Sequence, residues 1–332
     1  MKEIYFVSAR SEKFSYDASM VAKLEKMLRK MELSRYIAKG DYVAVKTHFG
    51  SEGGHRIVRP IFLRKVVEAV KAVGGKPFIT DTVRIEGLDY LETANMEGLN
   101  HLSVGCPVVL ADGLSGKNYQ KIKAGKILGE IGIASEIYDA DSMVTVTHCK
   151  GHIQAGFGGA IKNLAMGAIA ATNRDGKPER GRIHAIDTQL EWDAEKCELC
   201  GDCVEICDHD AMTMSDKIEI DQFKCHKCRR CVEVCKTDAL ILPIMEDRFQ
   251  MAMAEAAKAA LDTFSQGKVV YINFIMEVMP HCDCHPHSDV PVINDQGILM
   301  CDDIVAIDRA SLDIIENAAR LPDSKAENID RD

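Results

Sequence analysis

The sequence lacks three features that would link a protein to a membrane, to export or to nucleic acid. No apolar run approaches the ~20 residues that a membrane-spanning helix needs. The opening MKEIYFVSAR has no long apolar core of the kind found in signal peptides. Basic tracts are also absent, and the net charge is −10 at pH 7, which disfavours a nucleic-acid partner. We therefore expect a cytoplasmic protein without a membrane or nucleic-acid partner.

Cysteine, by contrast, is abundant. The chain has 332 residues and 13 cysteines. Disulfides are rare in a reducing compartment, so metal binding or redox chemistry explains the cysteines better. Most of them lie in two short runs, CELCGDCVEIC and CHKCRRCVEVC.

These two runs form an internal repeat of 28 residues. Each has the spacing C-x2-C-x2-C-x3-C, the first beginning at Cys197 and the second at Cys225. The flanks repeat as well, since Asp193 corresponds to Asp221. A repeat of this length indicates one supersecondary unit used twice.

The spacing predicts two [4Fe-4S] clusters. Thiolates separated by two residues reach three irons of one cubane, and the fourth cysteine of such a run ligates the other cluster. We therefore expect each run to give three ligands to one cluster and one to its neighbour. The first cluster would be held by Cys197, Cys200, Cys203 and Cys235, and the second by Cys225, Cys228, Cys231 and Cys207. Zinc is the alternative, but paired Cys-x2-Cys ligands do not explain two interlocking runs of four.

Residues 191–241 resemble the bacterial two-cluster ferredoxins in these runs. The resemblance implies an α+β ferredoxin-like domain that transfers single electrons. Those proteins usually have proline after the fourth cysteine, whereas Asp208 and Lys236 stand there in this chain.

The sequence on either side of the repeat alternates between strand and helix patterns. We predict strands at 3–9, 42–50, 76–81, 106–113, 142–152 and 268–278, and helices at 18–31, 59–75, 247–264 and 308–321. Such alternation predicts an α/β domain with a largely parallel sheet. We expect residues 1–190 and 242–332 to form this domain, with 191–241 inserted in a surface loop and a polar, disordered tail from 323.

Ligands of such folds bind beyond the carboxyl ends of the strands, and three predicted strand ends carry reactive side chains. The first includes His48, and the second includes His152 and Lys162 around the glycine-rich loop AGFGGAIK. Loops of this kind aim backbone N–H groups at an anion. A tight turn that allows close packing is the alternative.

The third strand end, MEVMPHCDCHPH, has two cysteines one residue apart among histidines. Thiolate and imidazole together suit a soft metal. We therefore predict an additional metal or redox site at Cys282 and Cys284, which Cys301 could complete. A loop whose cysteines have no ligand is the alternative. Cys106 and the methionines of 245–253 are expected in the core.

Several motifs together resemble the domain of unknown function 362 family along nearly the whole chain. They are KTHFGSEGG, FITDT, THCKGHIQAGFGGAIKNLAMG, CDC and DDIVAIDRASLDII. The resemblance implies the fold and the clusters but no particular reaction. GHIQAGFGGAIK is also similar to a loop of the lactate racemase family, which holds a nickel pincer cofactor and moves a hydride at a hydroxy acid. That similarity implies that His152 is an acid/base or metal-side histidine, that Lys162 contacts cofactor or substrate, and that His48 is a second acid/base.

Three functions follow from these predictions. The first is a redox enzyme or redox partner whose clusters relay electrons to or from a site with His48, His152, Lys162, Cys282 and Cys284. The second is a plain electron carrier. The third is a non-redox protein with structural clusters, either racemase-like or an assembly factor for a metal cofactor. The expected partner is a redox protein or a small-molecule substrate, and the sequence leaves the oligomeric state open, a dimer included.

Overall fold

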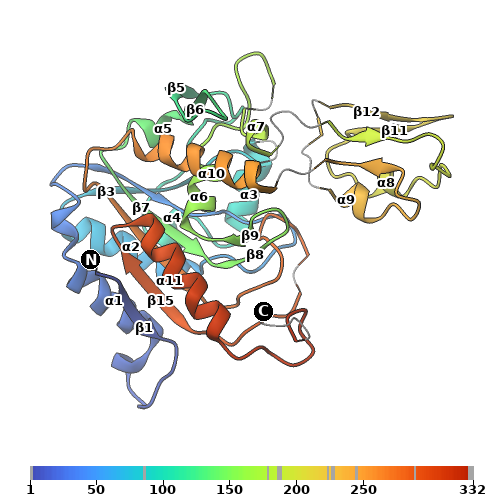
Figure 1. Ribbon diagram of the computed structural model, residues 1–332. Coiled ribbons are helices and arrows are strands. Elements are labelled where there is room, and N and C mark those ends of the chain that lie inside the picture. The colour runs from blue at the N-terminus through green and yellow to red at the C-terminus, as the bar shows by residue number, and fades with distance from the viewer. Residues whose placement is uncertain are drawn as a thin grey trace.

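The computed structural model describes residues 3–84, 87–177, 179–184, 189–222, 224–225, 229–243, 246–287 and 289–327. Within these ranges the chain forms a large α/β body and a small lobe, residues 189–243, that projects from it (Figure 1). The predicted α/β fold with a large, mainly parallel sheet is confirmed.

In the described part of the chain, seven strands form the central sheet, in the order β1-β15-β14-β7-β2-β3-β4. Their bounds are β1 Tyr5–Ser8, β15 Gly297–Cys301, β14 Val269–Ile275, β7 Ser142–His148, β2 Tyr42–Lys46, β3 Lys76–Asp81 and β4 Val108–Leu110. The strands from β14 to β4 are parallel, whereas β15 runs antiparallel to both β14 and β1. Because β14 pairs with β7, the segment after the small lobe returns to the sheet that the first part of the chain began.

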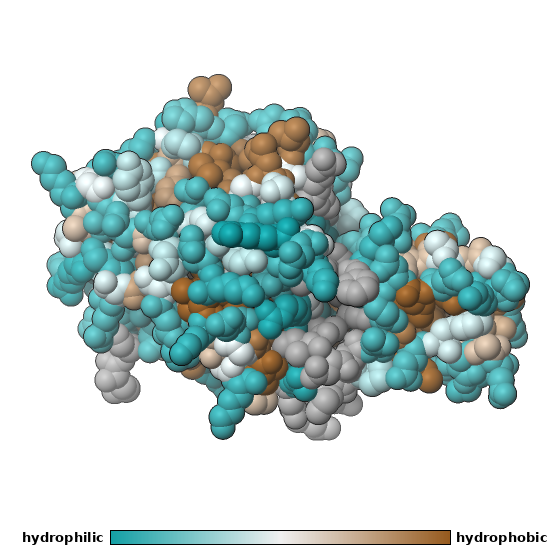
Figure 2. Space-filling view, turned by 90° about the horizontal axis from the view of Figure 1, so that it is seen from above, coloured by the Kyte–Doolittle hydropathy of each residue, from teal (hydrophilic) through white to brown (hydrophobic). Residues whose placement is uncertain are grey.

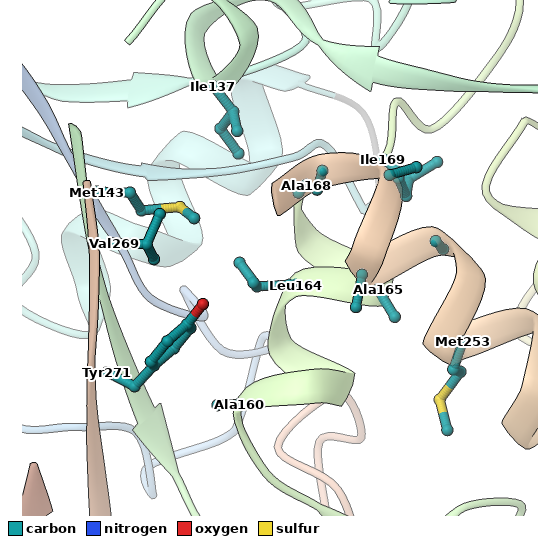
Figure 3. Close-up of a cluster of buried hydrophobic side chains, with 14 of the residues drawn as sticks. Ile137, Met143, Ala160, Leu164, Ala165, Ala168, Ile169, Met253, Val269 and Tyr271 are labelled. Carbon is teal, nitrogen blue, oxygen red and sulfur yellow. The ribbon is translucent and has the colours of Figure 1, made fainter. Parts of the chain in front are cut away.

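Helices cover both faces of this sheet. On one face lie α1 (Met20–Met31) and α2 (Pro60–Ala72), and on the other lie α6 (Ala160–Gly167), α10 (Glu246–Leu261) and α11 (Ile304–Asn317). The central strands are therefore buried on both sides, which explains their continuous apolar sequence. In β7, Val144 contributes to the core under α1 and α2, and Met143 to the core under α6. Figure 3 shows Leu164 of α6 pointing toward β14 in that second core.

The remaining elements of the large body connect or extend these layers. They are η1 Tyr16–Ala18, η2 Leu33–Arg35, α3 Gly87–Met96, α4 His101–Val104, β5 Tyr119–Lys123, β6 Glu130–Ala134, α5 Ser135–Tyr138, β8 Lys150–His152, β9 Gly156–Gly158 and α7 Gly181–His184. The predicted disordered tail is partly wrong, because Ser324 is buried and its hydroxyl donates to the Leu321 carbonyl. Residues 328–332 lie outside the described ranges.

The small lobe is built from one unit used twice. β10 (Glu191–Trp192) pairs with β13 (Leu240–Ile241), and β11 (Met212–Met214) pairs with β12 (Ile218–Ile220). The helices α8 (Asp202–Glu205) and α9 (Arg230–Glu233) begin 28 residues apart. Gly201 and Arg229, which precede them, both have positive φ, 85° and 68°. The sequence repeat is therefore also a structural repeat.

No helix within the described ranges is long and apolar enough to cross a bilayer. The face of the molecule in Figure 2 is mainly hydrophilic.

Candidate functional site

A cavity of about 160 Å³ lies beyond the carboxyl ends of β2, β3 and β7, next to the segment that follows β14. Its lining includes all five residues predicted for a site in the α/β domain, which are His48, His152, Lys162, Cys282 and Cys284. The structure thus brings three separate strand ends to one pocket, as the strand-end rule requires. The roles of these residues stay predictions.

Asp81, the last residue of β3, organises one wall of the pocket. Its carboxylate pairs with the Lys46 ammonium at 2.9 Å and accepts from the Tyr90 hydroxyl at 2.7 Å. Burial alone would raise the pKa of Asp81, but Lys46 and the hydrogen bond from His48 hold it below its usual range. The side chains of Lys46 and Asp81 are 1% and 3% exposed, so each charge depends on the other for compensation.

The same carboxylate fixes the ring of His48. Nδ1 of His48 lies 3.0 Å from Asp81 Oδ2. Because an ionised carboxylate only accepts, Nδ1 donates, and the lone pair of the neutral ring is on Nε2. Nε2 is buried and has no hydrogen-bond partner among the described residues. Burial lowers the pKa of His48, which favours this neutral ring.

A glycine brings α6 close to this wall. A Cβ on Gly167 would lie 2.0 Å from the Lys46 ammonium nitrogen. One turn earlier, Asn163 accepts from Lys46 and donates to the Val146 carbonyl at 3.1 Å. Only glycine allows the end of α6 to approach the buried ion pair so closely.

A second buried carboxylate, Asp283, ties the third strand end to the second. It lies 2.9 Å from Nδ1 of His148 and 2.8 Å from the Lys150 ammonium. Burial alone would raise the pKa of Asp283, but His148 and Lys150 lower it well below its usual range. This contact positions the two cysteines on either side of Asp283.

The two cysteines face Lys162 and His152. The Lys162 ammonium donates to Cys282 Sγ at 2.9 Å. One atom from each of His152, Cys282 and Cys284 lies within 4.8 Å of the others, so this trio could hold a metal ion. The hydrogen bond from Cys282 lowers the pKa of Cys284 to about 5, and the same contact raises that of Cys282 to about 12. The pair therefore carries one proton and one negative charge at neutral pH.

His152 has the opposite tautomer to His48. Its Nδ1 accepts from the backbone N–H groups of Gln154 at 3.3 Å and Ala155 at 3.0 Å. Burial and Lys162 lower its pKa far below the usual value, so the ring is neutral. The proton of the neutral ring is then on Nε2.

Two arginines add positive charge to the lining. Arg84 donates to the Ser51 hydroxyl at 3.0 Å, and Arg180 donates to the Thr82 hydroxyl at 3.0 Å. Neither guanidinium pairs with a carboxylate among the described residues, whereas Lys46 and Lys150 each pair with a carboxylate and Lys162 lies against the Cys282–Cys284 pair, which carries one negative charge. The pocket therefore carries uncompensated positive charge.

The prediction that the glycine-rich loop binds an external anion is wrong for the start of α6. The backbone N–H groups of Ala160 and Ile161 donate to the carboxylate of Asp308 at 2.7 and 2.8 Å. A Cβ on Gly159 would lie 2.4 Å from Asp308 Oδ1. The chain supplies its own anion from α11, and the glycine permits its close approach.

Of the other predictions for sulfur-containing residues, some are confirmed and some are wrong. Cys301, at the end of β15, is buried in the core that includes α6 and α10. It does not complete a site with Cys282 and Cys284, because the third member of that group is His152. Cys106 is buried in the core, as predicted. Of the methionines in 245–253, Met253 is buried, Met251 is 57% exposed, and Met245 lies outside the described residues.

The small-lobe cysteines gather in two groups. Burial raises the pKa of Cys203, and the neighbouring thiols of Cys200, Cys197 and Cys235 raise it further. A separate cavity of about 20 Å³ is lined by Cys207, Cys225 and Cys231. In each group, one run contributes several cysteines and the other run contributes one. The crossed ligation of two clusters stays a prediction. Cys228 lies outside the described residues.

His209 connects the two parts of the molecule. It lines the cavity of Cys207, Cys225 and Cys231, and it also lines the pocket of His48 and Cys282, together with Arg84 and His285. No sequence pattern marks His209 as a pocket residue, because it belongs to the small lobe and reaches the pocket only through the fold.

The family model described as Domain of unknown function (DUF362) matches residues 43–313. The chain belongs to this family. The match includes the three strand ends of the pocket and both cysteine runs. No curated protein matches the chain.

Among solved structures, the chain is similar to the lactate racemase apoprotein from Thermoanaerobacterium thermosaccharolyticum. The identity is 12% and the TM-score is 0.46. The likeness covers 89% of this chain and 56% of that one, so this chain spans little more than half the length of the racemase.

Proposed function

We propose that this protein is an iron–sulfur redox protein. Residues 191–241, within the small lobe, form a domain with two [4Fe-4S] clusters, and residues 1–190 and 242–332 form an α/β domain with a reactive pocket. The observation that carries the proposal is the position of His209. It lines both the cavity of Cys207, Cys225 and Cys231 and the pocket of His48 and Cys282. Bound clusters would supply single-electron transfer.

The cysteine groups fit two clusters that share ligands. Cys203 of the first run has Cys197 and Cys200 of its own run and Cys235 of the second run as neighbours. Cys207 from the first run lines a cavity with Cys225 and Cys231. Such crossing is typical of two-cluster ferredoxins.

The spacing of the sulfur atoms favours cubanes over zinc. Zn–S bonds of about 2.3 Å require all sulfurs of a zinc site to lie within roughly 4.6 Å of one another. Within the described ranges, only the trio of His152, Cys282 and Cys284 meets a limit of 4.8 Å. A cubane spreads its thiolates over four irons, so its ligands lie further apart.

The charge of the pocket indicates the class of substrate. Arg84 and Arg180 line it without a carboxylate partner in the described chain. A guanidinium is suited to bind a carboxylate or phosphate, so the substrate should be a small anion. Arg180→Gln should weaken binding of such an anion, with oxalate and inorganic phosphate as probes, about tenfold or more in calorimetry. Exposed Arg309→Gln is the control. Equal affinities in wild type and Arg180→Gln would reject this substrate class.

The clusters themselves are tested by metal analysis of protein made and purified without oxygen. We expect about eight irons per chain, as two cubanes require, and an EPR signal after reduction with dithionite. Zinc in place of iron, or a protein that stays colourless after anaerobic reconstitution with iron and sulfide, would contradict the proposal.

A second candidate function is racemisation by proton transfer at a carbon next to a carboxylate, a route distinct from the hydride transfer of the lactate racemase family. It is favoured by the complementary tautomers of His48, with a lone pair on Nε2, and His152, with a proton on Nε2. One ring can accept a proton while the other donates. Incorporation of deuterium from solvent into L-lactate, lost in His48→Gln, would support it, and its absence with wild type would exclude this reaction for lactate.

A further inference from the structure

Cys282 and Cys284 lie on one tight turn. The backbone N–H of His285 donates to the Cys282 carbonyl at 3.0 Å and closes the turn. The backbone N–H of Cys284 donates to Cys282 Sγ at 3.4 Å. Both sulfurs point to the same side, because both belong to the trio whose atoms lie within 4.8 Å of one another. A change of side-chain rotamers would then bring the sulfurs into bonding contact.

The surroundings of this pair suit a reactive thiolate. Cys282 Sγ accepts from the Lys162 ammonium at 2.9 Å as well as from the Cys284 N–H. The hydrogen bond from Cys282 and the adjacent Lys162 cation both stabilise the negative charge on Cys284, and the thiolate is the reactive form of cysteine. Cys282 is only 3% exposed, so these donors act without competition from bulk water.

The third member of the trio is poorly suited to ligate a metal. A metal-bound histidine normally donates its other ring N–H to an acceptor. His152 does the reverse, since its Nδ1 accepts from two backbone N–H groups. The lone pair of the neutral ring is therefore already used, and the remaining nitrogen carries a proton.

We infer that Cys282 and Cys284 form a redox-active dithiol that cycles with a disulfide in the pocket. The inference rests on the proposed function, because the clusters are its electron acceptors. On oxidation, a bond forms between the two sulfurs, and the one S–H bond of the pair breaks and releases its proton to solvent. Two electrons leave the pair, one to each [4Fe-4S] cluster, and reduction reverses each step. The two clusters together therefore accept the two electrons that the cysteine pair releases. The pair can in turn exchange two electrons with a small substrate in the pocket.

The thiols can be counted directly. Anaerobic full-length protein is equilibrated in buffers of reduced or oxidised dithiothreitol, alkylated with iodoacetamide, and weighed intact by mass spectrometry. We expect two fewer alkylated thiols in the oxidising buffer, and fragment masses that assign the loss to Cys282 and Cys284. The loss should vanish in Cys282→Ser and in Cys284→Ser and persist in Cys106→Ser, whose cysteine lies in the core. Equal counts in both buffers for wild type would overturn the inference.

Two further readouts separate this inference from the cluster proposal. In the first, the clusters of wild type with an oxidised cysteine pair are reduced with dithionite, and the excess reductant is removed. The EPR signal of the reduced clusters should then decay while the thiols of Cys282 and Cys284 appear. In Cys284→Ser the signal should persist. If clusters are present and the signal persists in wild type as well, the dithiol coupling is wrong while the clusters stand. The dithiol inference would also be overturned if wild type held one zinc or nickel ion per chain and Cys282→Ser did not. Cys282 and Cys284 would then form a metal site.

Discussion

At the scale of single residues, the pocket depends on charges that have been moved out of water. Lys46 and Asp81 are almost fully buried and lie 2.9 Å apart. Removing one partner leaves the other charge uncompensated, which typically costs about 3–5 kcal/mol. We therefore expect Lys46→Met to lower the free energy of unfolding by an amount of that order in urea denaturation.

The matched control for this change is an exposed pair. Lys258, in the last turn of α10, and Asp262, just after its end, form an i,i+4 ion pair with side chains 73% and 52% exposed. Such pairs contribute about 0.3–0.5 kcal/mol, so Lys258→Met should have a small effect. Similar losses of stability in Lys258→Met and Lys46→Met would mean that the buried pair has no special role.

The neutral histidines of the pocket make stability depend on pH. Burial, with Lys162 and Arg180, lowers the pKa of His184 to about 3. The folded state then binds fewer protons than the unfolded state between pH 6.5 and 3. The contribution of His184 to stability is therefore complete above pH 6.5 and is lost as the pH falls through this window.

His184→Gln should consequently flatten the loss of stability on acidification. The slope of unfolding free energy between pH 6.5 and 5 should become shallower by up to about 1.4 kcal/mol per pH unit. Thermal or urea unfolding at a series of pH values measures this slope. His101→Gln, at an exposed position, serves as control, and an unchanged slope in His184→Gln would refute the assignment.

At the scale of elements, the start of α6 depends on a carboxylate from another helix. Asp308 of α11 accepts from the first two N–H groups of α6 and also from the Asn273 amide at 2.9 Å. Loss of a capping carboxylate costs about 0.5–2 kcal/mol, and here the buried Asn273 amide also loses one of its two acceptors and keeps only the Ser311 hydroxyl. Asp308→Ala should therefore destabilise the protein by about 2 kcal/mol and speed hydrogen exchange at Ala160 and Ile161.

Half-exposed Asp313, which pairs with Arg309 on the same helix at 2.8 Å, is the matched site for comparison. Asp313→Ala should leave exchange at the start of α6 unchanged. If Asp308→Ala also leaves it unchanged, the helix does not need this cap.

Most elements of the large body could be predicted because their signals are local. The strand at 76–81 was predicted at its observed bounds, and the helix at 59–75 begins at Pro60, since proline suits the first turn. β15 was not predicted, because GILMC is a short buried run without alternation, and such runs do not distinguish strand from helix. Its antiparallel place beside β14 depends on the whole sheet.

At the scale of the whole molecule, the pocket could be predicted only in part. His48, His152, Lys162 and the Cys282 pair follow strands, so the strand-end rule could find them. Asp81 also ends a strand and could have been found by that rule. Arg84 follows β3 by three residues and is within reach of the same rule, whereas Arg180 and His209 lie at positions without such a pattern and reach the pocket through the packing of distant segments.

The central claim is that two twin loops exchange one cysteine each to hold a pair of cubanes beside the pocket. The measurement that tests it most directly is EPR and iron analysis of Cys207→Ser and Cys235→Ser, both made without oxygen, next to wild type. Each variant should lose one cluster, and not the same one, so that about half the iron remains and the two residual EPR spectra differ. If both variants kept the full iron content, or if both lost the same cluster, the crossed ligation and the electron path built on it would be contradicted.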